Sequence, residues 1–229
     1  MKNEFVETGN TKQFERVCND LTSAASLIGP SLAMITGPAG RGKTEAAKHY
    51  AVNSDAIYIP PMNIRTPAMI LREIAFELDG VRPSRSDACL GVIGEAMKKS
   101  RRLIMIDEAD LLQMACLEML RNVNERFACP IMLIGEDELK GKLGSRRRLS
   151  SRVRHRLEFA SINQPDITYY FRSALGQKIG ADVATAIHHY AKGDWRPVLT
   201  VAVSVERAMK ASSAKEITVE MVNDCIKNS

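Results

Sequence analysis

The chain of 229 residues contains a complete Walker A phosphate loop, Gly37-Pro38-Ala39-Gly40-Arg41-Gly42-Lys43-Thr44. The glycines let the backbone turn tightly enough for several N–H groups to point at one phosphate group. Lys43 supplies a point charge to the β- and γ-phosphates of a nucleotide, and the hydroxyl of Thr44 can bind Mg²⁺. An apolar run before the loop and a helix-forming run after it place the loop between a strand and a helix, as phosphate binding requires.

A second motif ends in two adjacent acids. Residues 103–106 are apolar, and Asp107 and Glu108 follow directly, which is the Walker B pattern. In a parallel sheet the carboxyl ends of the strands open on the ligand crevice. We therefore expect Asp107 to hold Mg²⁺ through water and Glu108 to polarise the water that attacks the phosphate.

The elements that must position these residues alternate along the first part of the chain. Apolar runs predict strands at about 32–36, 56–60, 102–107, 130–135 and 155–159. Helical patterns fill the intervals at about 11–28, 43–52, 66–79, 87–100, 111–126 and 137–151. The first helix has apolar residues at three- and four-residue spacing, and Gly29-Pro30 is expected to end it. This alternation predicts an α/β fold, a parallel sheet with helices on both faces.

After Phe159 the pattern predicts helices alone, at about 166–176, 181–192, 196–210 and 218–227. The third has an apolar stripe (Val198, Val201, Ala202, Val205 and Met209), and Thr218 can cap the fourth. We therefore predict a nucleotide-binding core over residues 1–160 and a small helical lid domain over 161–229.

Charge and composition limit the classes of function. The net charge of +5 is a weak bias toward polyanions. The arginines are concentrated in one stretch, Arg146, Arg147, Arg148, Arg152, Arg154 and Arg156. A solvated basic face explains such a stretch about as well as a binding surface does.

The N-terminal residues lack a secretory signal, and no apolar run approaches the roughly 20 residues of a membrane helix, so we expect a cytoplasmic protein with no membrane partner.

With both Walker motifs in place, the arrangement resembles that of the AAA+ ATPases over nearly the whole chain. The resemblance implies an AAA+ P-loop core with a helical lid, and ATP and Mg²⁺ as cofactors. Arg196, in Gly193-Asp194-Trp195-Arg196, matches the sensor 2 arginine that reaches the γ-phosphate. Glu136 falls at the sensor 1 position, where Asn, Thr or Ser is usual. An acid there repels the γ-phosphate unless it contacts the water or an arginine.

The resemblance also gives the arginine stretch a role. In AAA+ assemblies one subunit inserts an arginine finger into its neighbour's nucleotide site, and the segment before the fifth strand supplies it. Ser151-Arg152-Val153 matches the Ser-Arg-Phe or Ser-Arg-Val element of initiator-like members. Arg152 is the first choice for the finger and Arg148 the second.

Within the family, the chain most resembles the DNA-transposition ATPases of the phage Mu B type. The similar segments are Phe5-Val6-Glu7-Thr8, residues 37–47, Ile106-Asp107-Glu108-Ala109-Asp110 and Leu120-Arg121-Asn122-Val123. These ATPases polymerise on DNA as ATP-bound helical filaments, mark the target, and recruit and stimulate the transposase. The resemblance therefore implies double-stranded DNA, a transposase and further copies of the chain as partners, in the cytoplasm of a bacterial host cell.

The phage Mu protein carries an N-terminal helix-turn-helix domain, whereas only about 31 residues precede the first predicted strand here. We therefore expect DNA contacts from the ATPase body. Arg82 and Arg85 belong to the region that faces the axial channel in related rings, and Arg65 follows the second strand. Contacts from these arginines to phosphates would be sequence-independent and salt-sensitive.

Two other functions fit the same motifs. One is another AAA+ loader, such as a helicase loader or a replication initiator. The other is an ATP-gated interaction module in which Glu136 makes hydrolysis negligible and the nucleotide serves only for assembly. Turnover stimulated by DNA and transposase would exclude the module, and a neighbouring transposase gene would exclude the loader.

Overall fold

A computed structural model of the chain describes residues 5–23, 29–60 and 64–227. The chain divides into two compact units. The α/β unit contains Asn10–Pro38 and Lys43–Phe159, and the helical unit contains Met1–Gly9, Ala39–Gly42 and Ala160–Ser229.

The α/β unit is built on a five-stranded parallel sheet in the order β2-β3-β4-β1-β5. Its strands are β1 (Leu32–Thr36), β2 (Ile57–Ile59), β3 (Ile104–Ile106), β4 (Ile131–Ile134) and β5 (Val153–Glu158). The strands β1, β3 and β4 are fully buried, as the continuous apolar runs predict. All five predicted strands are therefore confirmed, each within about two residues of its expected ends.

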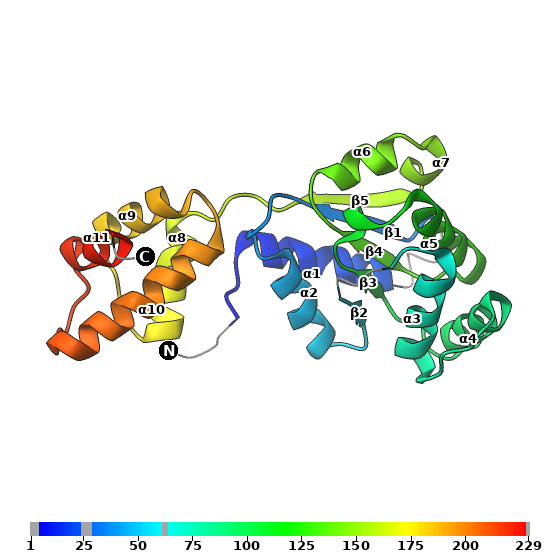
Figure 1. The fold of residues 1–229 in the computed structure, drawn as a ribbon, viewed down its shortest axis with the longest axis horizontal. Helices are drawn as coiled ribbons and strands as arrows, with labels where there is room; N and C mark the ends of the chain where they lie inside the picture. The colour runs from blue at the N-terminus through cyan, green and yellow to red at the C-terminus, as the bar shows by residue number, and fades with distance from the viewer. Residues whose placement is uncertain (1–4, 24–28, 61–63, 228–229) are drawn as a thin grey trace. The chain divides into compact units, whose positions relative to one another are not determined.

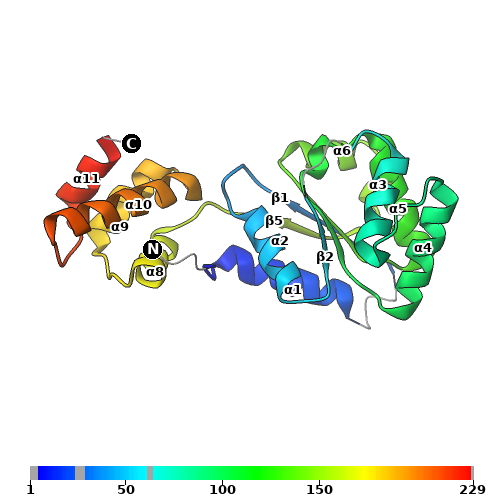
Figure 2. The same cartoon turned by 60° about the horizontal axis from the view of Figure 1, so that its bottom comes forward.

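Helices cover both faces of the sheet, because alternate residues of each strand point to opposite sides. Ala33 and Ile35 pack with α1 (Gly9–Thr22) and α2 (Lys43–Val52), whereas Leu32 and Met34 face the other core. The second core contains α3 (Pro67–Asp79), α4 (Ser86–Lys99), α5 (Met114–Phe127), α6 (Glu138–Gly144) and α7 (Arg147–Ser150). Figure 2 shows α1 and α2 on one side of the strands and α3, α4 and α5 on the other. The predicted α/β architecture is confirmed.

Two of the predicted helices depart from their expected bounds by more than three residues in the structure. The first ends at Thr22, where its hydroxyl donates to the carbonyl of Cys18, so the expected end at Gly29-Pro30 is wrong. Residues 24–28, with Ala25 and Ile28 of the predicted stripe, lie outside the described residues. The predicted helix 137–151 is two helices, α6 and α7, since Arg146 adopts an extended backbone (φ −125°, ψ 99°) directly after Gly144-Ser145. A 3-10 turn, η2 (Ala109–Leu111), precedes α5.

The helical unit contains α8 (Gln164–Leu175), α9 (Ala181–Ala191), α10 (Trp195–Ser212) and α11 (Val219–Lys227), all visible in Figure 1. The stripe predicted on α10 is confirmed: its four alanine and valine residues are fully buried, and Met209 packs against their cluster. The hydroxyl of Thr218 accepts the Met221 N–H, as expected of a cap. At α8 the cap is Asn163, which forms a reciprocal capping box with Asp166. Within the described part of the chain, every helix is too short or too polar to cross a bilayer.

Candidate functional site

Three neighbouring strands of the α/β unit deliver the predicted site residues to one edge of the sheet. Gly37 follows β1, Asp107 follows β3 and Glu136 lies two residues after β4. The strand order places β4 between β3 and β1. Parallel strands end at the same edge, so residues about 100 positions apart in sequence meet there. The sequence could not give this strand order, although it identified every strand.

The phosphate loop begins at a position that only glycine fills. Gly37 has φ 142°, and a Cβ there would lie 2.9 Å from the carbonyl oxygen of Phe159. At the other end of the loop, the buried Lys43 ammonium donates to the carbonyls of Gly37 at 2.6 Å and Pro38 at 2.9 Å. Burial lowers the pKa of Lys43, and the carboxylates of Glu136 and Asp107 oppose that shift. The loop therefore holds a desolvated cation among its own carbonyls.

Asp107, which follows β3, lies beside the first turn of α2 and accepts three hydrogen bonds. Its Oδ2 receives the hydroxyls of Thr44 and Tyr58, each at 2.8 Å, and its Oδ1 receives the Glu108 N–H at 3.0 Å. Hydroxyl and carboxylate oxygens are the ligands that Mg²⁺ prefers, so Thr44 and Asp107 fit the predicted metal. Burial, followed by the bond to Asp107, raises the pKa of Tyr58. Sequence reasoning missed Tyr58, whose only signal was a polar group inside the apolar strand β2.

Glu108 turns away from the sheet. Its backbone is left-handed (φ 48°) and its side chain is exposed, so the carboxylate is accessible at the edge where β3 ends. Burial of part of the group raises the pKa of Glu108, and the charges of Asp107, Asp110 and Glu136 add to the shift. A carboxylate with a raised pKa is a stronger base, which suits a group that polarises water.

Glu136 contributes negative charge to the same edge. Its carboxylate raises the pKa of Lys43 more than any other nearby charge does. Its N–H donates to Oδ1 of Asp110 at 3.0 Å, and a Cβ on Gly135 would collide with that carboxylate. Lys142 donates to the carbonyls of Asp110 and, at 3.1 Å, Leu112. Asp110 thus ties the turn after β3 to the turn after β4, a role that sequence reasoning did not assign.

The loop residues Ala39–Gly42 and the predicted sensor Arg196 belong to the helical unit. Within it, the Trp195 N–H donates to the carbonyl of Gly40 at 2.9 Å, and a Cβ on Gly40 (φ 74°) would collide with the Asp194 carboxylate. Asp194 caps α10 by accepting the Arg196 N–H at 2.8 Å. The Arg196 side chain is exposed, and its contact with a γ-phosphate stays a prediction.

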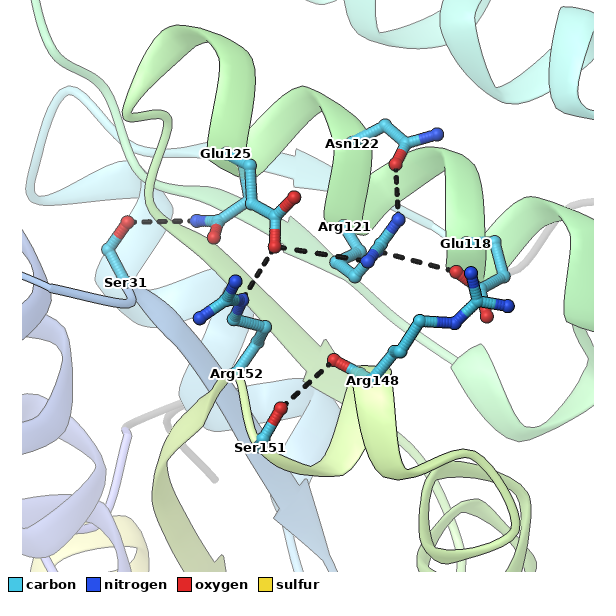
Figure 3. A network of polar contacts seen from close by, with 9 residues as sticks. Ser31, Glu118, Arg121, Asn122, Glu125, Arg148, Ser151 and Arg152 are labelled. Atoms are coloured by element: carbon cyan, nitrogen blue, oxygen red, sulfur yellow. Dashed lines mark hydrogen bonds and ion pairs between the residues drawn. The ribbon is translucent and has the colours of Figure 1, made fainter.

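The two finger candidates lie next to β5. Arg152 is the residue directly before the strand, and its Nε donates to Oε1 of Glu125 on α5 at 2.6 Å (Figure 3). Arg148 lies on α7, where its carbonyl accepts the Ser151 hydroxyl at 3.3 Å, and its side chain is exposed. The structure therefore distinguishes them: Arg152 is held by a carboxylate of the neighbouring helix.

Two of the predicted DNA contacts already have acidic partners. Arg82 pairs with Glu73 at 2.9 Å and stacks over the Phe76 ring at 3.9 Å. Arg85 forms two bonds with Asp87, each at 3.0 Å. Arg65 is exposed on the segment before α3. The Arg85–Asp87 pair is exposed, and pairs of this kind are worth only about 0–1 kcal/mol, so a phosphate could displace Asp87.

The chain is similar to known proteins of the AAA family and to two proteins, one of a prophage and one of a phage. A family model described as "AAA domain" matches residues 28–143. The Mu-like prophage FluMu DNA transposition protein B of Haemophilus influenzae is 30% identical over 139 residues, 59% of this chain and 46% of that protein. The ATP-dependent target DNA activator B of Escherichia phage Mu is 28% identical over 172 residues, 71% of this chain and 54% of that protein. The chain thus spans about half the length of these relatives.

Solved structures agree on the fold. Cdc6p from Pyrobaculum aerophilum is 17% identical with a TM-score of 0.72, and the match covers 99% of this chain and 69% of that one. The Holliday junction branch migration motor RuvB of Thermotoga maritima is 19% identical with a TM-score of 0.66, covering 98% and 70%. At these identities the likeness shows the fold alone.

Proposed function

Since the chain belongs to the AAA domain family, we propose that it is an ATPase that binds duplex DNA without sequence preference and regulates transposition. ATP drives its self-association on DNA, as a helical filament or a ring. The assembled form selects a target and recruits and stimulates a transposase. The observation that carries the nucleotide part is the pairing of Thr44 with Asp107 beside a buried Lys43.

The residues of the α/β unit supply the nucleotide chemistry. Lys43 exchanges the carbonyls of Gly37 and Pro38 for the β- and γ-phosphates, which satisfy an ammonium better than neutral oxygens do. Thr44, and Asp107 through water, would hold Mg²⁺, which would neutralise phosphate charge. Glu108 polarises the attacking water, and Tyr58 keeps the Asp107 carboxylate oriented.

Hydrolysis depends on a second copy of the chain. The γ-phosphate charge increases as the leaving group departs, and a cation from a neighbour stabilises it only in the assembly. Arg152 is the proposed finger and Arg196 the sensor within the same copy. Glu136 places an acid near the γ-phosphate, so we expect slow hydrolysis that DNA and the partner accelerate.

The names of the relatives support the DNA part of the proposal. One is a DNA transposition protein and another an ATP-dependent target DNA activator. The identical residues cover less than a third of each match, so target selection and the transposase partner remain proposals for this chain.

Removing charge at Arg82 and Arg85 should weaken binding to every DNA sequence alike. If both arginines contact phosphates, the double alanine variant should lower the slope of log K against log salt by about 0.9 per contact. ATP affinity should stay unchanged, because both residues lie outside the phosphate loop. The measurement is fluorescence anisotropy of a labelled random duplex with ATP over a salt series.

Lys98→Ala with Lys210→Ala is a matched control, since both lysines are exposed and paired with a glutamate on their own helix. This control should keep the wild-type slope. An unchanged slope in the Arg82/Arg85 variant would mean that residues other than these two contact the DNA. Absence of wild-type binding at any salt would contradict the DNA function and favour the ATP-gated interaction module.

A loader or initiator role is the second candidate. The Ser151-Arg152-Val153 element, which resembles that of initiator-like AAA+ proteins, favours it. A transposase that binds the ATP-bound protein and raises its turnover would exclude it.

A further inference from the structure

Four charged side chains alternate in sign between α5 and the start of β5. Arg152 Nε lies 2.6 Å from Glu125 Oε1, and Arg121 Nη1 approaches the same oxygen at 3.9 Å. Arg121 Nε lies 3.3 Å from Glu118 Oε2. Figure 3 shows Glu125 between the two arginines. Arg121 is largely buried, with 16% of its side chain exposed, so it compensates the charge of Glu125 from the protein side.

The helix that carries Glu125 is fixed at this point. The preceding residue, Asn124, is buried, and its amide donates to the Ser31 hydroxyl at 2.8 Å and the Cys129 carbonyl at 2.6 Å. These bonds attach the last turn of α5 to the residues that precede β1 and β4. The last turn of α5 is therefore fixed next to β1, the strand that leads into the phosphate loop, and next to β4.

The way Glu125 holds Arg152 leaves the useful end of the guanidinium accessible. A guanidinium has five N–H donors, one on Nε and four on the terminal nitrogens. Among the described residues, the hydrogen bonds of the Arg152 side chain involve Nε alone. Two N–H groups of a guanidinium can bind two phosphate oxygens at once. A carboxylate that sequestered the arginine would also engage a terminal nitrogen, as Asp87 does by accepting from both Nε and Nη2 of Arg85.

We infer that Glu125, supported by Arg121, is a positioning residue that directs the terminal nitrogens of Arg152 toward the nucleotide of a neighbouring copy. The inference rests on the proposed ATPase function. Arg152 is 46% exposed, so without this bond its long side chain would sample many rotamers. In this inference Glu125 acts through Arg152 and contacts neither the nucleotide nor the attacking water.

The first test is the turnover of ATP by Glu125→Ala. Loss of orientation should lower kcat roughly 10- to 100-fold, as misplacement of a catalytic group does, and should leave ATP affinity unchanged. Glu125→Gln keeps an oxygen that accepts from Nε and should restore part of the rate. Glu95→Ala removes an exposed helical glutamate paired with Lys98 and should behave as wild type. The melting temperature of Glu125→Ala should hardly differ from that of the wild type, because the pair of Glu125 with Arg152 is half-exposed.

The second test asks whether Glu125 is needed in the copy that supplies the arginine or in the copy that binds ATP. A mixture of Lys43→Ala, which offers a finger, with Arg152→Ala, which offers a nucleotide site, should hydrolyse ATP at the mixed interfaces. Adding Glu125→Ala to the Lys43→Ala chain should remove this activity, whereas adding it to the Arg152→Ala chain should not. A merely structural role for Glu125 would affect both arrangements equally.

Three results would overturn the inference: faster turnover by Glu125→Ala, an unchanged rate, or equal loss in both mixtures. Faster turnover would mean that Glu125 withholds the arginine. Wild-type protein that hydrolyses no ATP, alone or with DNA, contradicts the proposed function itself, and the inference with it.

Discussion

Lys43→Ala should reduce the affinity for ATP about 100-fold or more. Each charge-assisted hydrogen bond to a phosphate is worth about 1.5–3 kcal/mol, and the variant loses the buried ammonium that donates to two carbonyls of the phosphate loop. The measurement is titration calorimetry of both proteins with ATP and Mg²⁺.

Lys48→Ala provides the control, because Lys48 lies on the same helix but is exposed and paired with Glu45. This variant should bind ATP as wild type does. Equal affinity for ATP in wild type and Lys43→Ala would refute the assignment of residues 37–44 as a nucleotide site.

Arg152→Ala should bind ATP normally and hydrolyse it about 10³-fold more slowly, the lower end of the range measured for arginine fingers. The physical reason is that the finger contacts the phosphate only as charge develops on it. Steady-state turnover and a separate ATP titration measure the two properties. Arg148→Ala, which changes an exposed arginine of α7 four residues earlier, should turn over at nearly the wild-type rate. The reverse ranking would make Arg148 the finger.

Most of the fold could be predicted from sequence because its signals are local. The apolar runs identified all five strands, and the predicted AAA+ P-loop fold is confirmed by the family match and the structural neighbours. The assignment of residues 37–44 and Asp107 to a nucleotide site stays a prediction. The break between α6 and α7 had a weaker local signal, a glycine and a serine inside an otherwise helical pattern.

The parts of the site that escaped prediction depend on contacts between distant segments. Tyr58 reaches Asp107 because β2 pairs with β3, with Tyr58 opposite Met105. Asp110 accepts the Glu136 N–H only because the turns after β3 and β4 lie next to each other. Glu125 meets Arg152 across 27 positions of sequence. No periodicity or composition indicates such pairs, since each depends on strand order and on how a helix is seated on the sheet.

Under the proposed function ATP controls DNA binding by this chain. The most direct test of this control is the affinity of wild-type protein for one random duplex at low salt with ATP, with ADP and without nucleotide. Under the proposed function each copy supplies only a few phosphate contacts, so we expect tight binding from the assembled form alone. We expect tight binding with ATP and weak binding in the other two states. Equal affinity in all three states would contradict control by ATP.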